Sequence, residues 1–291
     1  VAGNHDAPER IGFGGALHDP RRALIRGSLR RSAEPLILED AAGPVAVAAL
    51  PYAGIFAARD RYASPGIMSP DDVTAAQITE ATASLPPKSR LVAVAHTFVA
   101  GGSESDSERS LESAGGIEQV APSRFAGCSY VALGHLHRPQ QIAGEEGPLR
   151  YSGSIMPFGF DEVDTEKSVS LVELAWWGVE SVTSISLRQP RPLKIFRGSF
   201  DELMAESDDS FAKLELTDAA SIPDAMSRLR ERYPRAVQLE WVSRESAPEG
   251  SRVGVKKESL RDPREVLRGF YQDVAGRELG EEDLSLVGET L

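Results

Sequence analysis

Short, wholly apolar runs separated by longer polar stretches are the feature that most constrains the fold of this chain. The three clearest are residues 44–52 (PVAVAALPY), 91–95 (LVAVA) and 130–133 (YVAL). Runs of this length, rich in Val or bounded by Gly and Pro, are typical of strands buried on both faces. Between the first two, Ser69-Pro70-Asp71-Asp72 is a helix-start pattern that predicts a helix to about residue 84. Buried strands that alternate with helices predict an α/β layered sheet.

Further along the chain the pattern changes. Residues 149–152, 168–174 and 179–187 predict strands, the last two as a hairpin, and QPRP at 189–192 indicates a linker. Beyond it, alternating residues 211–216 and 236–242 flank a helix candidate at 223–233, which predicts a small α+β unit. Residues 262–275 and 281–287 predict two short amphipathic helices. We therefore expect three parts, at 1–188, 189–250 and 251–291.

Composition excludes several classes of protein. The chain has 291 residues, a net charge of −12 and a single cysteine, Cys128. One cysteine can form neither an internal disulfide nor a cysteine zinc site, which favours a reducing compartment, the cytoplasm. No apolar run approaches the roughly 20 residues that a membrane span needs. Because the chain is acidic on both sides of the linker, contact with DNA would depend on local arginines and bound cations, not on a basic domain.

Four of the five histidines stand at or just beyond the ends of expected strands. They are His5, in the opening segment GNHD, then His96, His135 and His137. Ligands of open α/β sheets bind beyond the carboxyl ends of the strands, so separate segments that end in histidine point to one place. Imidazole and oxygen donors without cysteine suit divalent Mn, Fe, Co or Zn. The sequence therefore predicts a metal centre at this edge of the sheet.

Four stretches give the chain a resemblance to a known family. They are GNHDAPERIGFGG (3–15), VAHTFVAGGSESDSER (94–109), YVALGHLHRPQ (130–140) and RYSGSIMPFGFDEVDTEKSVSLVEL (150–174). The chain resembles the calcineurin-like metallophosphoesterase superfamily and, more narrowly, the SbcD family of bacterial nuclease subunits, over essentially its whole length. The resemblance implies a layered metallophosphoesterase β-sandwich flanked by helices, a small α+β capping domain, and C-terminal helices that dock on the ATPase SbcC.

The resemblance also implies a ligand set. Asn4, His96 and His135 match the family's ligands for one metal ion, and His137 matches a ligand of the other. Two divalent ions are therefore expected, with Mn²⁺ as the favoured metal. Two metals about 3.5–4 Å apart can polarise one phosphate and hold a hydroxide for in-line attack.

His5 matches the catalytic histidine, and Asp6 is expected to orient its imidazole. An imidazole at this place can protonate the leaving sugar oxygen. The family's Asp-x-His motif and its Gly-Asp motif, whose aspartate bridges both metals, would precede Val1. We therefore expect the chain to be N-terminally truncated and to be inactive on its own.

A cluster of arginines has two open interpretations. Arg21, Arg22, Arg26, Arg30 and Arg31 fall within one short segment, and Arg138 directly follows His137. These guanidinium groups can bind DNA phosphates. They are equally well explained as a solvated surface.

The function expected from the resemblance is that of a DNA nuclease subunit. It combines double-strand exonuclease with single-strand or hairpin endonuclease activity, and acts with SbcC in DNA break repair and recombination. A homodimer within a heterotetramer with SbcC, without membrane contact, is implied. Two alternatives stay open: another calcineurin-like phosphodiesterase or phosphatase, or a non-catalytic scaffold that binds SbcC.

Overall fold

The computed structural model describes residues 1–15, 17–19, 21–29, 34–105, 108, 112–113, 116–117, 119–144 and 147–242. Arg30, Arg31 and the C-terminal segment predicted at 251–291 lie outside the described residues, so the three-part division stays a prediction. Contacts divide the chain into two units. The first holds residues 1–195 with 208–213 and 233–237, and the second holds 196–207 and 214–232 and continues from Gln238. Within the described ranges, no helix is long and apolar enough to cross a membrane.

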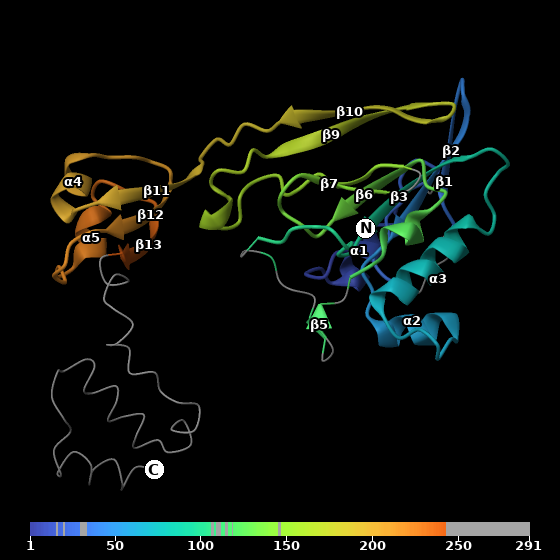
Figure 1. Cartoon of the computed structure of the whole chain (residues 1–291), viewed down its shortest axis with the longest axis horizontal. Helices are drawn as coiled ribbons and strands as arrows, with labels where there is room; N and C mark the ends of the chain where they lie inside the picture. The colour runs from blue at the N-terminus through green and yellow to red at the C-terminus, as the bar shows by residue number, and fades with distance from the viewer. Residues whose placement is uncertain are drawn as a thin grey trace, which may run out of the picture. The chain divides into compact units, whose positions relative to one another are not determined.

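A six-stranded sheet forms the centre of the first unit, in the order β1-β2-β3-β6-β8-β7 (Figure 1). Strands β2, β3, β6 and β8 are mutually parallel, and the edge strands β1 and β7 pair antiparallel to β2 and β8. The strands are β1 (Leu36–Asp40), β2 (Gly43–Leu50), β3 (Arg90–His96), β6 (Tyr130–Gly134), β7 (Gln140–Ile142) and β8 (Leu149–Tyr151). Because the four inner strands are parallel, their carboxyl ends meet at one edge.

The three apolar runs of the sequence form β2, β3 and β6, three of the four inner strands of this sheet. Their side chains supply most of the core, including Leu50, Leu91, Val131 and Leu133. The small Ala46, Ala48, Ala93 and Ala95 are also buried among them. A strand that is covered on both faces has apolar side chains at successive positions. The continuous apolar run is therefore the sequence feature that predicts these three inner strands.

Helices α2 (Ile55–Tyr62) and α3 (Pro70–Thr82) connect β2 to β3 and pack against each other. Figure 1 shows both beside the sheet, and α3 contacts β2. The predicted helix start is confirmed: the Ser69 hydroxyl accepts from the Asp72 N–H, and the Asp72 carboxylate accepts from the Ser69 N–H. This capping box fixes where α3 begins. Another helix, α1 (Pro8–Gly15), follows the opening segment.

The described residues also form three smaller sheets. Strands β9 (Ser168–Ala175) and β10 (Gly178–Ser186) form the predicted hairpin. Strands β11 (Leu193–Gly198), β12 (Phe211–Leu216) and β13 (Ala236–Trp241) form a three-stranded sheet accompanied by α4 (Phe200–Ala205) and α5 (Ala225–Leu229). Two-residue strands β4 (Glu112–Ser113) and β5 (Gly116–Ile117) pair separately. Mixed α/β architecture is confirmed.

Candidate metal centre

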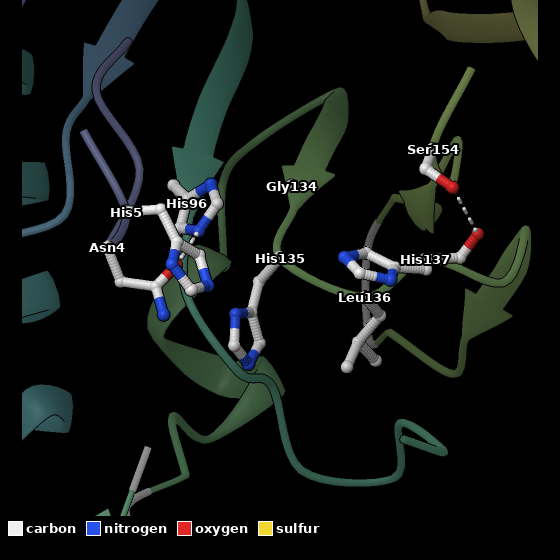
Figure 2. Close-up of a pocket in the computed structure, with 9 residues that line it drawn as sticks. Asn4, His5, His96, Gly134, His135, Leu136, His137 and Ser154 are labelled. Carbon is white, nitrogen blue, oxygen red and sulfur yellow. Dashed lines mark hydrogen bonds between the residues drawn. The ribbon is translucent and has the colours of Figure 1, made fainter. Parts of the chain in front are cut away.

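The four histidines predicted at strand ends all line one pocket of about 210 Å³. The residues that line it are Asn4, His5, His96, Gly134, His135, Leu136, His137, Gly153 and Ser154. Figure 2 shows Asn4, His5 and His96 close together, His135 beside them and His137 further along the same loop. Five of the six predicted catalytic and metal-binding residues therefore lie on one pocket, and Asp6 does not line it.

Backbone hydrogen bonds hold the opening segment at the end of the sheet. The Ala2 N–H donates to the Arg26 carbonyl (2.9 Å), and the Ala2 carbonyl accepts from the Tyr52 N–H (2.9 Å), just beyond β2. A Cβ at Gly3 would lie 2.6 Å from Cε1 of His96, so only glycine allows this approach. The Asp6 carboxylate accepts from the Gly3 N–H at 2.7 Å. Asp6 thus stabilises the turn that presents Asn4 and His5, and its effect on the His5 imidazole stays a prediction.

His96 ends β3 and faces Asn4 across the pocket. Its Nε2 lies 2.9 Å from Oδ1 of Asn4, and its ring contacts that of His135 edge-on, with centroids 5.6 Å apart. Burial, and then the neighbouring His135, lowers the pKa of His96 to about 4. The imidazole is therefore neutral at physiological pH, which is the form that binds a metal ion.

His135 combines two features that are costly in an ordinary residue. Its backbone has φ 119°, in a region that favours glycine, and its side chain is buried. Within the described part of the chain its Nε2 is buried without a hydrogen-bond partner. Burial also lowers the pKa of His135, so this nitrogen belongs to a neutral ring. A buried, unpaired imidazole nitrogen in a pocket of other nitrogen and oxygen donors fits a metal ligand.

His137 is held by groups that the sequence did not single out. Nδ1 of its ring lies 3.0 Å from Oε1 of the buried Glu162. Its backbone N–H donates to the Glu108 carboxylate. Lys167 donates to the His137 carbonyl at 3.0 Å. Glu108 belongs to the polar loop that follows β3, and Glu162 and Lys167 lie within the motif at 150–174. Only their membership of the stretches 94–109 and 150–174 pointed to these residues, because nothing in a sequence pairs a glutamate with a histidine 25 residues away.

The donor chemistry of this pocket fits a divalent metal, although the described residues do not form a complete ligand shell. Among them, no three His, Cys, Asp or Glu side chains make a cluster that could hold an ion. The pocket brings together four imidazoles and one amide oxygen, and burial lowers the pKa of two of the imidazoles, His96 and His135. The assignment of Asn4, His96 and His135 to one ion and of His137 to another therefore stays a proposal.

The arginines predicted to contact DNA have varied surroundings. Arg21 and Arg26 line a separate pocket of about 490 Å³, where the Arg26 guanidinium donates to the Glu34 carbonyl at 2.7 Å. The Arg22 N–H donates to the Asp19 carbonyl. The Arg138 guanidinium donates to the Asp161 carbonyl at 3.1 Å. DNA binding by these residues stays a prediction, and the bonds of Arg26 and Arg138 give each a role in holding loops together.

A mixed α/β sheet with imidazoles and an amide gathered beyond its carboxyl ends is consistent with a metallophosphoesterase-like fold. The comparisons with known proteins are more specific. The family model of the SbcD C-terminal domain, described as the type 5 capsule protein repressor C-terminal domain, matches residues 189–275. The SbcD subunit of the nuclease SbcCD from Staphylococcus epidermidis is 26% identical over 286 residues, which are 97% of this chain and 74% of the relative. Together they confirm the predicted resemblance to SbcD.

Proposed function

We propose that this chain is the nuclease subunit of an SbcCD-type complex, which hydrolyses DNA phosphodiester bonds with divalent metal ions. The observation that carries the proposal is the single pocket lined by Asn4, His5, His96, His135 and His137, from three segments far apart in the sequence. The similarity to the S. epidermidis nuclease subunit along 97% of the chain favours DNA as the substrate.

The pocket residues have separate proposed roles, and four of them are proposed metal ligands. Asn4, His96 and His135 would hold one metal ion and His137 would contribute to a second, with Mn²⁺ as the proposed metal. When bound, the ions supply a polarised phosphate and an activated water. Because imidazole and amide ligands bind a metal ion as neutral groups, these four would add no negative charge facing an anionic phosphodiester. The amide of Asn4 in particular offers a neutral oxygen where a carboxylate would repel the substrate.

His5 is the proposed general acid. It lines the pocket and is exposed, so it can reach a bound substrate from the solvent side. Its imidazole would give a proton to the leaving sugar oxygen as the phosphodiester bond breaks. Transfer of this kind contributes about 10²–10⁴-fold to the rate.

The experiment that tests the proposal measures cleavage of linear duplex and hairpin DNA in Mn²⁺ by the full-length natural protein in complex with its ATPase partner, since this chain alone is expected to be inactive. We expect cleavage to be lost in His135→Gln together with Mn²⁺ affinity. In His5→Asn we expect cleavage to fall by about 10²–10⁴-fold with Mn²⁺ affinity unchanged. Equal loss of metal affinity in both variants would contradict the separate roles given to His5 and His135.

The same experiment separates the alternatives. Turnover of a simple phosphodiester without cleavage of DNA would identify a small-molecule phosphodiesterase. Binding of the ATPase partner without any metal-dependent hydrolysis would identify a scaffold. The homodimer within a heterotetramer and the cytoplasmic location belong to this proposal. Cys128 is buried and is the single cysteine of the sequence, so it forms no internal disulfide, which is compatible with a reducing compartment.

A further inference from the structure

We propose that Glu162 and Lys167 act as a buried positioning pair for His137. The pair fixes which ring nitrogen of His137 carries the proton and where the ring sits. This inference rests on the proposed function, because it concerns how one proposed metal ligand is prepared. It also gives a role to the segment GFDEVDTEK (159–167), which neither the metal ligands nor the general acid explain.

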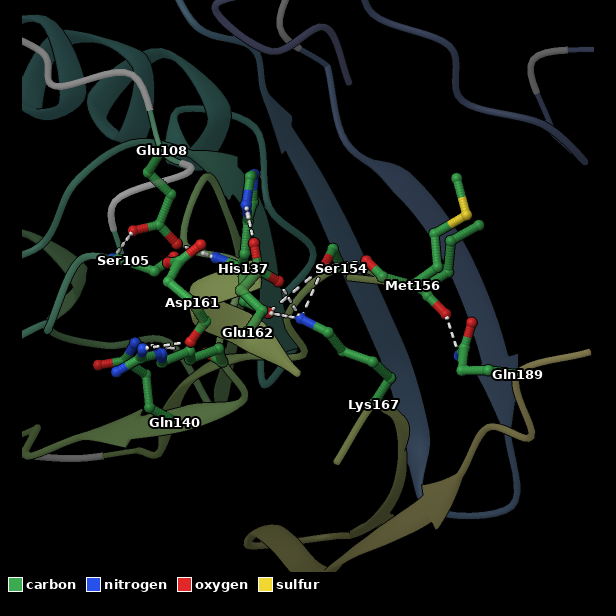
Figure 3. A network of polar contacts seen from close by, with 12 residues as sticks. Ser105, Glu108, His137, Gln140, Ser154, Met156, Asp161, Glu162, Lys167 and Gln189 are labelled. Carbon is green, nitrogen blue, oxygen red and sulfur yellow. Dashed lines mark hydrogen bonds and ion pairs between the residues drawn. The ribbon is translucent and has the colours of Figure 1, made fainter. Parts of the chain in front are cut away.

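The contact at the imidazole decides the tautomer. Nδ1 of His137 lies 3.0 Å from Oε1 of Glu162, and a carboxylate can only accept (Figure 3). In the neutral form of the ring that a metal ion requires, Nδ1 must therefore carry the proton, and the lone pair that can bind the ion is on Nε2. A carboxylate behind a histidine ligand is the usual way in which proteins orient the ligand and raise its basicity. The Phe158 ring also contacts the His137 ring, with centroids 5.2 Å apart.

Lys167 ties the same carboxylate to the backbone of His137. Its ammonium group donates to Oε2 of Glu162, to the His137 carbonyl (3.0 Å) and to the Ser154 hydroxyl (3.0 Å). These three bonds account for its three donors. The Ser154 N–H donates to the same His137 carbonyl at 3.0 Å. Side chain and main chain of His137 are therefore held from one centre, as Figure 3 shows.

Burial makes a role in stability alone a poor explanation for this pair. Glu162 is 0% exposed and Lys167 is 2% exposed. Removing two charges from water is costly, and an apolar pair of similar volume would stabilise a fold at least as well. Glu162 is the last residue of a short 3₁₀ helix (Phe160–Glu162). Its backbone N–H donates to the Gly159 carbonyl at 3.1 Å, and this bond helps to place the carboxylate beside His137. Its two oxygens contact the two partners, one His137 and the other Lys167.

The first test needs no substitution in the network and no metal. With only five histidines in the chain, selective ¹⁵N labelling gives resolvable imidazole signals in NMR spectra of the metal-free protein, assigned through His137→Asn. We expect His137 to be protonated at Nδ1 in the wild type. A ring protonated at Nε2 alone would overturn the proposal.

The second test replaces the pair without leaving a buried charge. In Glu162→Leu/Lys167→Met both charges are removed together, which protects the fold, and thermal unfolding checks that it does. We expect His137 to lose its preference for the Nδ1 proton and Mn²⁺ affinity to fall about 10–100-fold. Glu162→Gln, which keeps the volume, should show a smaller fall in the same direction. Glu173→Gln, on exposed β9, is the matched control and should keep wild-type affinity.

The outcomes distinguish the two proposals. Wild-type Mn²⁺ affinity and an unchanged His137 tautomer in the folded double variant would overturn the positioning role and leave the nuclease proposal standing. A wild-type protein that binds no Mn²⁺ in complex with its partner would contradict the nuclease proposal itself.

Discussion

At the scale of single residues, the pocket concentrates arrangements that cost free energy. His135 holds a backbone conformation that favours glycine and leaves a buried ring nitrogen without a partner among the described residues. Such conformations cost about 1–3 kcal/mol each and persist where the surroundings impose them, most often at functional sites. A neutral His96 beside it, with a pKa of about 4, repels an incoming cation less than a charged imidazole would. Both features are explained if this pocket binds an ion.

Gly153 offers the sharpest single-residue prediction. Its φ is +78°, and a Cβ there would lie 2.6 Å from the His137 carbonyl oxygen and 2.9 Å from the backbone nitrogen of Pro139. Gly153→Ala should therefore displace the His137 loop, lower the free energy of unfolding, and weaken Mn²⁺ binding by about tenfold or more. Urea unfolding and Mn²⁺ titration measure the two effects.

Gly127→Ala is the control, because Gly127 has a similar φ of +82° and open space around its Cβ position. It should show only the backbone penalty, about 1–2 kcal/mol, with normal metal affinity. If both variants bind Mn²⁺ equally well, the Gly153 contact does not position His137.

At this scale the sequence could predict the pocket residues but not their supports. His96 and His135 were recognisable because each follows a buried apolar run, and strand ends converge by topology. Glu162 and Glu108 were not, because a carboxylate buried behind a ligand looks like any other acidic residue until the chain is folded. Arg26 differs from them because the sequence did single it out, as a residue that could bind DNA. Its guanidinium donates to the Glu34 carbonyl, a contact that no local pattern indicates.

At the scale of elements, α3 is defined by its capping box. The Ser69 hydroxyl and the Asp72 carboxylate each satisfy a backbone N–H of the other. Ser69→Ala should lower the free energy of unfolding by about 0.5–2 kcal/mol, measured by urea titration. Ser84→Ala, at an exposed position beyond the end of the helix, should change it little. Equal effects from the two substitutions would show that the box contributes nothing specific.

A surface ion pair beside β11 gives a pH-dependent prediction. Hydrogen bonds from Lys194 and Ser210 lower the pKa of Asp208 to about 2. A depressed carboxyl pKa stabilises the fold above the unfolded value near 3.8, and this contribution is lost as pH falls through about 2. Asp208→Asn should therefore be less stable than the wild type at pH 7, by no more than about 1 kcal/mol for a surface pair.

That difference in unfolding free energy should shrink as the pH is lowered from 4 toward 2. Thermal unfolding of both proteins across this range measures it. A difference that is independent of pH would mean that Asp208 acts through packing and not through its charge.

The inner elements were predictable and the edges were not. β2, β3 and β6 appear as unbroken apolar runs, and α3 carries its own start signal. β1 begins Leu-Ile-Leu but exposes four of its five residues, and β7 has only three residues, so neither shows the pattern of a buried strand. Their pairing comes from the antiparallel neighbours β2 and β8, which is tertiary information.

At the scale of the whole molecule, a parallel sheet explains why distant segments build one site. The carboxyl ends of β3, β6 and β8 lie at the same edge, and the opening segment is bonded next to the end of β2. The sequence predicted this edge, and the metal chemistry expected there stays a prediction. The resemblance to SbcD, confirmed by the matches to residues 189–275 and along 97% of the chain, supplied the ligand assignment that spacing alone could not.

The most direct test of the metal centre is the Mn²⁺ affinity of the protein in complex with its ATPase partner, measured by the loss of the free Mn²⁺ signal in electron paramagnetic resonance. We expect His135→Gln to weaken binding by at least about tenfold, as loss of a metal ligand should, and His5→Asn to leave it unchanged. Wild-type affinity in His135→Gln would contradict the claim that the histidines at the strand ends hold the metal.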